Sequence, residues 1–186
     1  TNPDFVDIAT PPESHLELVE AIAGRGLPAI CQRPLAPSLD VAKEIVAVSE
    51  NSGTVLVVHE NFRFQPWYRE MDHLIRNGQL GHIHNVSFRL RPGDGQGPTA
   101  YLSRQPYFTH MPRFLVHETA THLIDTFLFL LGEVTGVTAL LRSLNSYIAG
   151  EDAGIIIFDF ASGQTGLFDG KRLNEHVAER NPVDDG

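Results

Sequence analysis

The chain has 186 residues, 42% of them hydrophobic and 20% charged, a composition that fits one or two globular domains and excludes collagen-like, low-complexity and wholly disordered proteins. Its 14 basic and 23 acidic residues give a net charge of −9, so we expect neither nucleic acid nor an anionic membrane surface as a partner. The lone cysteine, Cys31, rules out a disulfide within the chain, and no apolar run approaches the roughly 18 residues of a membrane span.

Short apolar runs alternate with amphipathic segments over the first third of the chain. The runs are closed by turn residues, which predicts buried strands over residues 5–9, 27–31 and 54–59. Helices are predicted between them, one that ends at Gly24 and one that Ser38 caps and Gly53 ends. This order predicts a parallel sheet with right-handed crossovers and both faces covered, and we assign residues 1–60 to it.

The pattern changes after residue 60. We predict, in order, a helix over residues 66–77, a strand over 82–91, a long loop over 92–112, a helix over 113–131, and strands over 134–144, 153–160 and 165–168. Residues 161–164 suit a hairpin turn between the last two strands. Residues 61–186 are therefore expected to form an α+β domain with a large, mostly antiparallel open sheet.

Polar residues follow all three predicted strands of the first domain. They include Thr10, Gln32 and Arg33, and the segment 59–63. Because the carboxyl ends of parallel strands meet at one edge, where open α/β sheets bind ligands, we expect a binding crevice there. The alternative is that these segments are ordinary connections between strands and helices.

Ionisable side chains interrupt the apolar side of the predicted helix over 113–131. Glu118, His122 and Asp125 follow the spacing i, i+4, i+7 that places residues on one face of an α-helix. Histidine is the usual general base near neutral pH, and a carboxylate one turn away can orient its imidazole. The alternative is a buried structural pair of His122 and Asp125.

Two other patterns resemble a zinc-binding helix and a dinucleotide-binding loop, but they lack the geometry that these sites need. His117 and His122 are five residues apart, about 140° around an α-helix, so they cannot bind one zinc ion from one helix face, and we predict no metal site. The glycines at 93, 95 and 97 neither follow a buried strand nor open a helix. We interpret that segment as a flexible loop and not as a dinucleotide-binding loop.

Five short motifs occur together in a fixed order. The first is Ala9-Thr10-Pro11 with His15, and the second is Gln32-Arg33-Pro34, where a Glu-Lys-Pro tripeptide is usual. The third is Asn61 to Tyr68 (Asn-x-Arg-Phe-x-Pro-x-Tyr), and the fourth is Gly78 to Gly81 (Gly-x-Leu-Gly). The fifth is Glu118-Thr-Ala-Thr-His122-Leu-Ile-Asp125, where Asp-x-Gly-x-His-x-x-Asp is usual. Together they resemble the glucose–fructose oxidoreductase / inositol dehydrogenase / MocA family, written Gfo/Idh/MocA below. The resemblance runs from about Asp4 to Phe168.

The resemblance implies a two-domain oxidoreductase. Its N-terminal Rossmann domain would bind NAD or NADP, and hydride would pass between the nicotinamide and a hydroxyl-bearing carbon of a sugar, a cyclitol or a related small molecule. The chain would hold the C-terminal half of the Rossmann sheet. The GxGxxG unit is then expected before Thr1, and the second sheet is expected to continue past Gly186. By this interpretation the 186-residue polypeptide alone would be a poor catalyst.

The resemblance also implies roles for individual residues. His122 matches the family's proton-transfer histidine, Arg33 stands at its motif lysine, and Glu118 stands at its helix acid. The residues expected to bind the cofactor are Thr10, Pro11, His15, Gln32, Arg33, Asn61 and Arg63. The residues expected to bind the substrate are Trp67, Tyr68, Tyr101, Arg104, Tyr107, Arg113 and Asp125. For the aromatic residues the alternative is core or interface packing, and for the two arginines it is a surface salt bridge.

Two departures from the family pattern bear on activity. Arg33 keeps its proton where a lysine could relay one, and Glu118 is one methylene longer than the usual acid. The hypotheses are that His122 is the sole proton carrier, that the substrate class is unusual, or that the protein is an inactive family member that binds a nucleotide or sugar. We further expect a cytoplasmic homo-oligomer that associates through the open sheet.

Overall fold

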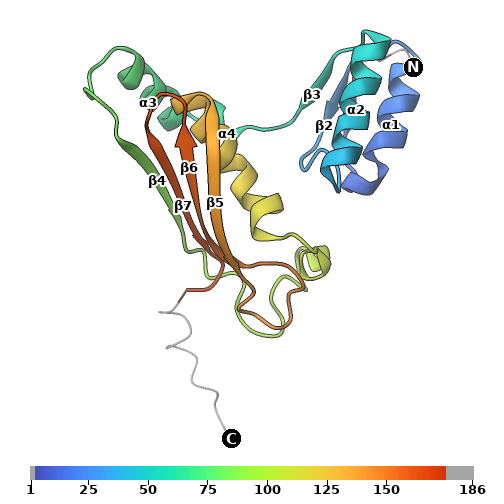
Figure 1. The fold of residues 1–186 in the computed structure, drawn as a ribbon. Coiled ribbons are helices and arrows are strands. Elements are labelled where there is room, and N and C mark those ends of the chain that lie inside the picture. Colours follow the sequence, from blue (N-terminus) through green and yellow to red (C-terminus); the bar gives the residue numbers. More distant parts are fainter. Residues whose placement is uncertain (1–2, 175–186) are drawn as a thin grey trace, which may run out of the picture. The chain divides into compact units, whose positions relative to one another are not determined.

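The structure, a computed structural model, describes residues 3–174 (Figure 1). The chain divides into two compact units, Thr1–Asn61 and Phe62–Gly186, and each is described by itself. No helix within residues 3–174 is long and apolar enough to cross a membrane.

The N-terminal unit is a three-stranded parallel sheet with two α-helices. Its elements in chain order are β1 (Val6–Ile8), a 3-10 turn η1 (Pro12–Ser14), α1 (His15–Ala23), β2 (Ala29–Cys31), α2 (Leu39–Ser52) and β3 (Leu56–Val58). The strands lie in the order β1-β2-β3, and Ile8, Cys31 and Val58 are in register. The predicted parallel α/β arrangement is therefore confirmed, but the expectation that both faces are covered is wrong for the described residues, because the core residues Ile8 and Cys31 share one face and Val57 on the other is 49% exposed.

The ends of α2 follow the two signals in the sequence. The Ser38 hydroxyl accepts a hydrogen bond from the Val41 N–H (3.3 Å), which satisfies one of the free N–H groups at the start of the helix. Gly53 ends the helix with φ of 65°, a conformation that side chains with a Cβ disfavour. Both predicted caps are confirmed.

The core of this unit lies between the sheet and the two helices. Its buried residues are Ile8, Val19, Ile22, Ala29, Cys31, Ala36 and Ile45. The expectation that β3 is buried is wrong, because Val57 is 49% exposed and Val58 40% exposed. β3 is an edge strand, and Val57 points away from the face that carries Cys31 and that packs against the helices.

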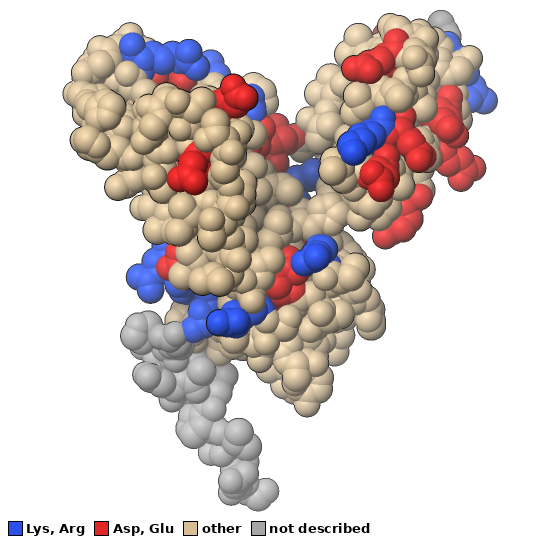
Figure 2. Space-filling view, in the orientation of Figure 1, with Lys and Arg blue, Asp and Glu red and all other residues tan. Residues whose placement is uncertain are grey.

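Charge is unevenly distributed along the chain. Residues 1–61 contain three basic and nine acidic residues, so most of the net charge of −9 belongs to the N-terminal unit. Figure 2 shows the acidic side chains gathered over this unit.

The C-terminal unit contains a four-stranded sheet and the helices that pack on it. Its elements in chain order are η2 (Phe62–Phe64), α3 (Pro66–Arg76), β4 (Asn85–Leu90), η3 (Pro106–His110), a π-helical turn η4 (Leu115–Ala120), α4 (Thr121–Leu131), β5 (Val134–Arg142), β6 (Ala153–Phe160) and β7 (Thr165–Lys171).

The sheet has the strand order β4-β7-β6-β5. The β5–β6 and β6–β7 pairs are antiparallel and the β4–β7 pair is parallel, so the prediction of a mostly antiparallel sheet is confirmed. The predicted hairpin joins β6 to β7 through Gly163, whose φ is 89°.

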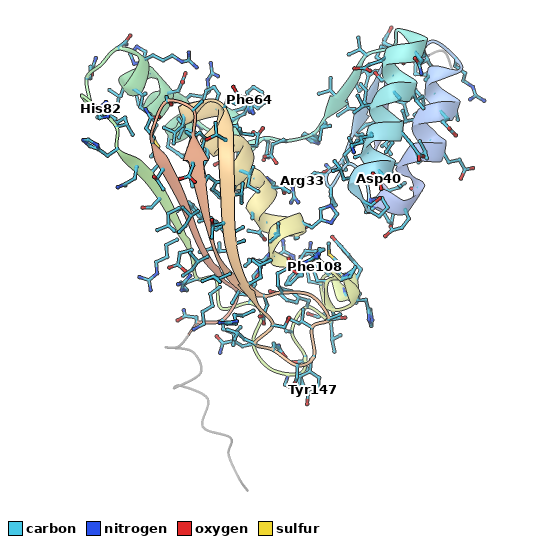
Figure 3. All side chains as sticks on the ribbon, viewed as in Figure 1. Arg33, Asp40, Phe64, His82, Phe108 and Tyr147 are labelled. Atoms are coloured by element: carbon cyan, nitrogen blue, oxygen red, sulfur yellow. The ribbon has the colours of Figure 1, made fainter. Side chains whose placement is uncertain are left out.

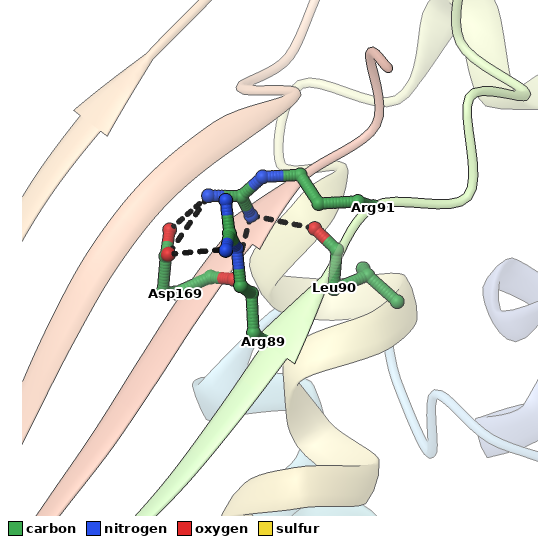
Figure 4. Close-up of polar contacts among 4 residues, drawn as sticks. All are labelled: Arg89, Leu90, Arg91 and Asp169. Atoms are coloured by element: carbon green, nitrogen blue, oxygen red, sulfur yellow. Dashed lines mark hydrogen bonds and ion pairs between the residues drawn. The ribbon is translucent and has the colours of Figure 1, made fainter. Parts of the chain in front are cut away.

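β7 extends three residues beyond its predicted end at Phe168. Asp169 and Gly170 look like turn residues in the sequence, but both are in the strand. Asp169 is held by two arginines: both of its carboxylate oxygens lie 2.7 Å from Nη2 of Arg91, and Oδ2 lies 3.8 Å from Nε of Arg89 (Figure 4). Gly170 allows the Phe168 ring to lie against the backbone, since a Cβ there would be 2.4 Å from that ring.

One face of this sheet packs against α4 and the turn before it. The buried residues of this core are Leu115, Ala120, Leu123, Phe127, Ile156, Phe158, Phe160 and Phe168. Along β6, burial alternates as the sequence predicts, and Ile155 and Ile157 on the other face are 43% and 38% exposed. In the described part of the chain, the second face of the sheet is therefore open.

The helix over 113–131 is not a continuous α-helix, which corrects the prediction. Residues 115–120 form a π-helical turn, and the N–H of Thr121 bonds to the carbonyl of Val116, five residues back. α-Helical geometry begins only at Thr121. Single π turns inside helices occur frequently at functional sites.

The loop over 92–112 is packed, so the interpretation of its glycines as flexible is also wrong. The N–H of Gly95 donates to the carbonyl of Arg172 (3.2 Å), and the carbonyls of Gly95 and Gly97 accept from the Asn145 amide (2.8 and 2.9 Å). A Cβ on Gly95 would lie 2.7 Å from Cβ of Arg172. Gly93 and Gly95 allow close approach of the backbone to Asn174 and Arg172, which a flexible loop would not require.

Candidate functional site

Polar groups after β2 and β3 contact each other, and those after β1 contact each other within their own segment. Nε2 of Gln32, after β2, lies 3.0 Å from Nδ1 of His59, after β3. The Thr10 hydroxyl, after β1, lies 2.7 Å from that of Ser14. This edge of the sheet therefore presents hydrogen-bonding groups from consecutive strands, as the parallel arrangement requires.

His15 is fully buried and joins two of these loops. Its Nε2 lies 2.8 Å from the carbonyl of Thr10, and its Nδ1 lies 2.9 Å from the carbonyl of Leu35. Both ring nitrogens are thus engaged with the backbone of the unit itself. The predicted contact between His15 and a cofactor stays a prediction.

Arg33 lies on the loop that follows β2, where Figure 3 labels it. Its N–H donates to Oε1 of Gln32 (3.3 Å), and its peptide bond to Pro34 is cis. Pro11 and Asn61 are exposed on the loops after β1 and β3. The cofactor contacts expected of these residues stay predictions.

In the C-terminal unit, His122 is 8% exposed and lies in the first turn of α4. The ring of Phe62, from η2, stacks on its imidazole with centroids 4.0 Å apart and planes 9° apart. Tyr68 stacks next, 6.4 Å from Phe62 at 20°. Burial raises the pKa of Tyr68, which opposes formation of its phenolate, while a hydrogen bond with Trp67 acts the other way. The stacked rings of Phe62 and Tyr68 therefore position the imidazole of His122.

The residue after Phe62 fastens the same turn to α4. Nε of Arg63 donates to Oδ2 of Asp125 (2.6 Å), and Nη2 donates to the other carboxylate oxygen. The guanidinium also lies 5.5 Å from the centroid of the Phe129 ring. Arg63 was predicted to bind cofactor and Asp125 substrate, and the structure pairs them with each other.

Glu118 lies on the π turn, four residues before His122, and its N–H donates to the carbonyl of Phe114 (2.8 Å). The extra residue in this turn changes the angle between Glu118 and His122 that a continuous α-helix would impose. The angle of about 140° between His117 and His122 assumed α-helical geometry in the same way. Within residues 3–174, no group of three His, Cys, Asp or Glu side chains could hold a metal ion.

The predicted substrate-binding aromatic residues fall into two groups. Trp67 and Tyr107 are exposed at 56% each. Tyr101 instead packs edge-on against Phe108 and Phe114, at centroid distances of 5.2 and 5.3 Å, and donates to Oδ1 of Asp94 (2.9 Å). Burial is the main cause that raises the pKa of Tyr101 well above its ordinary value. The packing alternative therefore describes Tyr101 in this unit.

Arg104 and Arg113 are exposed on the long loop and at its end. Their expected contacts with a substrate stay predictions.

Three residues that organise the C-terminal unit were not singled out in the sequence. Phe62 stacks on His122, while Glu151 and Arg172 hold the π turn, as described below. Phe62 stands inside a motif that was recognised, between Asn61 and Arg63. Glu151 begins an acidic pair just before an apolar strand, which is a detectable signal because charged residues are seldom buried without partners.

Both units match descriptions of one protein family. Residues 1–60 match the oxidoreductase family with an NAD-binding Rossmann fold, and residues 68–180 match the GFO/IDH/MocA C-terminal domain. The chain belongs to the Gfo/Idh/MocA oxidoreductase family. The resemblance drawn from the five motifs is thereby confirmed, and so is the α/β fold class.

Three Gfo/Idh/MocA relatives illustrate the similarity. The D-apiose dehydrogenase of Paraburkholderia graminis is 39% identical over 181 residues, which cover 96% of this chain and 46% of that protein. The inositol 2-dehydrogenase of Rhizobium meliloti is 26% identical, with 91% and 50% covered. The crystal structure of an oxidoreductase from Agrobacterium radiobacter in complex with NAD+, L-tartaric acid and magnesium is 36% identical, with a TM-score of 0.86 and with 94% and 50% covered. The chain thus spans about half the length of these Gfo/Idh/MocA proteins.

Proposed function

We propose that the protein containing this chain is an NAD-dependent oxidoreductase that acts on a hydroxyl-bearing carbon of a sugar or polyol. The observation that carries the proposal is His122, a buried imidazole stacked on Phe62 at the start of α4, in a Gfo/Idh/MocA chain. Oxidation of an alcohol needs a base for the hydroxyl proton, and histidine is suited to that task near neutral pH.

The cofactor proposed is NAD. The description of the family matched by residues 1–60 supports it, and so does the NAD+ in the Agrobacterium radiobacter structure. The chain's own residues fit, because Thr10, Gln32 and Arg33 supply hydroxyl, amide and guanidinium groups at the carboxyl edge of a parallel sheet. When bound, the nicotinamide would accept or return the hydride.

The remaining steps belong to side chains of this chain. His122 would take the proton from the substrate hydroxyl. Arg33 stands at the family's motif lysine and would stabilise developing negative charge, since its guanidinium stays protonated, but it would not relay a proton. Glu118, four residues before His122, would orient the imidazole or the substrate.

The substrate proposed is a small sugar, with D-apiose as the first compound to test, because a D-apiose dehydrogenase is 39% identical to this chain. Trp67 and Tyr107 present exposed rings on which the apolar face of a sugar could stack. Arg104 and Arg113 would donate hydrogen bonds to its hydroxyls.

The test replaces His122 by Ala in the protein expressed from its complete reading frame. We expect kcat to fall at least about 100-fold, the lower bound for losing a general base, with NAD binding retained. His73→Ala is the matched control, since His73 lies on α3 with its side chain 63% exposed, and it should keep the wild-type rate. A wild-type rate in His122→Ala would overturn the assignment. NAD binding without turnover across a broad screen of sugars and polyols would favour the alternative of an inactive binding protein, for which Arg33 and Glu118 are the motivation.

We also propose a homo-oligomer that associates through the open face of the C-terminal sheet. Leu140, Ile155 and Ile157 expose 64%, 43% and 38% of their surface on adjacent strands of that face. A contiguous apolar patch of this kind is typical of an interface. Ile155→Lys should lower the mass measured by sedimentation, whereas Leu39→Lys on α2 should not. An unchanged mass in both variants would refute the interface.

The cytoplasm is the proposed location, since the reaction would draw on the NAD pool inside the cell. Cell fractionation with an antibody against the protein would test it, and recovery outside the cytoplasmic fraction would refute it.

A further inference from the structure

The π turn before His122 is held at its N-terminal end by Glu151. The carbonyl of Glu151 accepts the N–H of Leu115 (2.8 Å), and its carboxylate Oε1 accepts the N–H of Val116 (3.1 Å). Glu151 is only 6% exposed. A negative group at the start of a helical segment satisfies N–H groups that have no partner within the helix, and it suits the local dipole.

A second anchor, Arg172, reaches the far end of the same turn. Its Nη2 donates to the hydroxyl of Thr119, next to Glu118, and its Nη1 donates to Oδ2 of Asp94 (3.0 Å). The guanidinium lies 5.0 Å from the centroid of the Phe114 ring. Arg172 therefore contacts Phe114, which comes just before residues 115–118, and Thr119, which comes just after them.

Both anchors are themselves fixed by the end of the sheet. Asp152, beside Glu151, is fully buried and accepts the N–H groups of Leu144 and Asn145 (2.7 and 2.8 Å). The carbonyl of Asp152 accepts the N–H of Arg172 (2.8 Å). The two anchors thus share a hydrogen-bonded frame at the β6–β7 end of the sheet.

One atom of Arg172 is buried unfavourably, which favours a role for this residue beyond packing. Among residues 3–174, its Nε is a buried nitrogen with no hydrogen-bond partner. Buried groups of this kind are rare, and each one calls for an explanation. The explanation we give is that Arg172 places a positive charge against the π turn, which carries Glu118.

We propose that Glu151 and Arg172 are positioning residues that fix the π turn, and through it the direction of Glu118 and the imidazole of His122. The inference rests on the proposed function of His122. A change in the π turn should affect the rate because catalytic groups must be positioned accurately. A displacement of about 1 Å caused by a distant substitution can lower the rate about 100-fold.

The activity test compares Glu151→Gln with Glu151→Leu in the full-length protein. Gln keeps an oxygen for the N–H of Val116, so kcat should stay within about threefold of wild type, whereas Leu removes it and should cost between about tenfold and 100-fold. The KM for NAD should not change in either variant. An equal loss of thermal stability in both variants, with kcat per folded molecule unchanged, would overturn the proposal.

A second arm does not depend on activity. The Phe62 ring, 4.0 Å from the imidazole, should shift the NMR resonances of His122, and that shift reports the position of the imidazole. Thr119→Val removes the oxygen that Arg172 reaches and should move these resonances. Thr135→Val, which removes a comparable hydroxyl contact to the carbonyl of Asp159, should leave them in place.

The two arms separate the two proposals. If the wild-type protein has no turnover, the proposed function fails, but displaced His122 resonances in Thr119→Val still support the anchors. If Glu151→Leu does not fold, Thr119→Val decides. Unmoved resonances in Thr119→Val would refute the positioning role, whatever the protein catalyses.

Discussion

Arg63 and Asp125 form an ion pair, and substitutions at the two positions should be strongly coupled in their effect on the free energy of unfolding. It joins η2 to α4 through two hydrogen bonds from one guanidinium to one carboxylate, and the two side chains are 33% and 25% exposed. Asp125→Asn removes the charge and leaves Arg63 facing a neutral amide. The same turn carries Phe62, so the pair also holds the ring that stacks on His122.

The size of the effect follows from that geometry. A hydrogen bond to a charged group contributes about 1.5–3 kcal/mol, and partial exposure reduces the value through screening by solvent. We expect Asp125→Asn to lower the free energy of unfolding by about 2 kcal/mol, and the midpoint of thermal unfolding by roughly 6–8 °C for a unit of this size. We expect a coupling energy between the two positions of about 1.5 kcal/mol.

The assay is a double-mutant cycle with Arg63→Met, Asp125→Asn and the double variant, each unfolded in urea. The matched control is the cycle for Arg76 and Asp72, an i, i+4 pair on α3 whose arginine side chain is 67% exposed. That pair should couple by no more than about 0.5 kcal/mol. Equal coupling in the two cycles would refute the view that Arg63 clamps the turn to α4.

Other predictions follow from single contacts. Gly95→Ala should lower the free energy of unfolding by about 1–3 kcal/mol in urea titrations, because its Cβ would lie 2.7 Å from Cβ of Arg172; unchanged stability would contradict the packing described. Ser38→Ala should cost about 1 kcal/mol through the lost cap on α2, measured in the same way. Burial, with a smaller contribution from Asp7, raises the pKa of Cys31 to about 11, so the thiol should resist alkylation at pH 8 until the protein is unfolded. Since the folded state then holds this proton more tightly than the unfolded one, the free energy of unfolding should fall as the pH rises from about 9 towards 11.

Elements bounded by local signals could be predicted from the sequence. Ser38 and Gly53 delimit α2 because a side-chain cap and a left-handed glycine act on the helix that they flank. The alternation along β6 likewise reports which side chains face the core. Both signals lie within a few residues of the structure that they determine.

Features that depend on distant neighbours could not be predicted. The apolar sequence of β3 does not show whether another strand pairs beyond it, so the exposure of this edge strand could not be predicted. The packing of Gly95 depends on Asn145 and Arg172, which are 50 and 77 residues away in the sequence.

The candidate site shows the same division. His122, Arg63 and Asp125 were all selected by their residue types and motif positions, but the contacts that each of them makes were not predicted. The pairing of Arg63 with Asp125 joins residues 62 positions apart. The π turn is a further case, because a single wide turn barely alters the apolar periodicity from which a helix is predicted.

That π turn also makes the length of the helical segment a part of the site. Each residue advances an α-helix by about 100°, and the wide turn takes up one extra residue, so the same residues wound as a continuous α-helix would rotate the preceding chain by roughly that angle relative to His122. Leu115 and Phe114, both fully buried, would then leave their packing positions. In an alignment, the extra residue of the π turn appears as a one-residue gap in a relative whose helix is α-helical throughout. Family members that keep every motif residue but lack this spacing should not be assigned the same site.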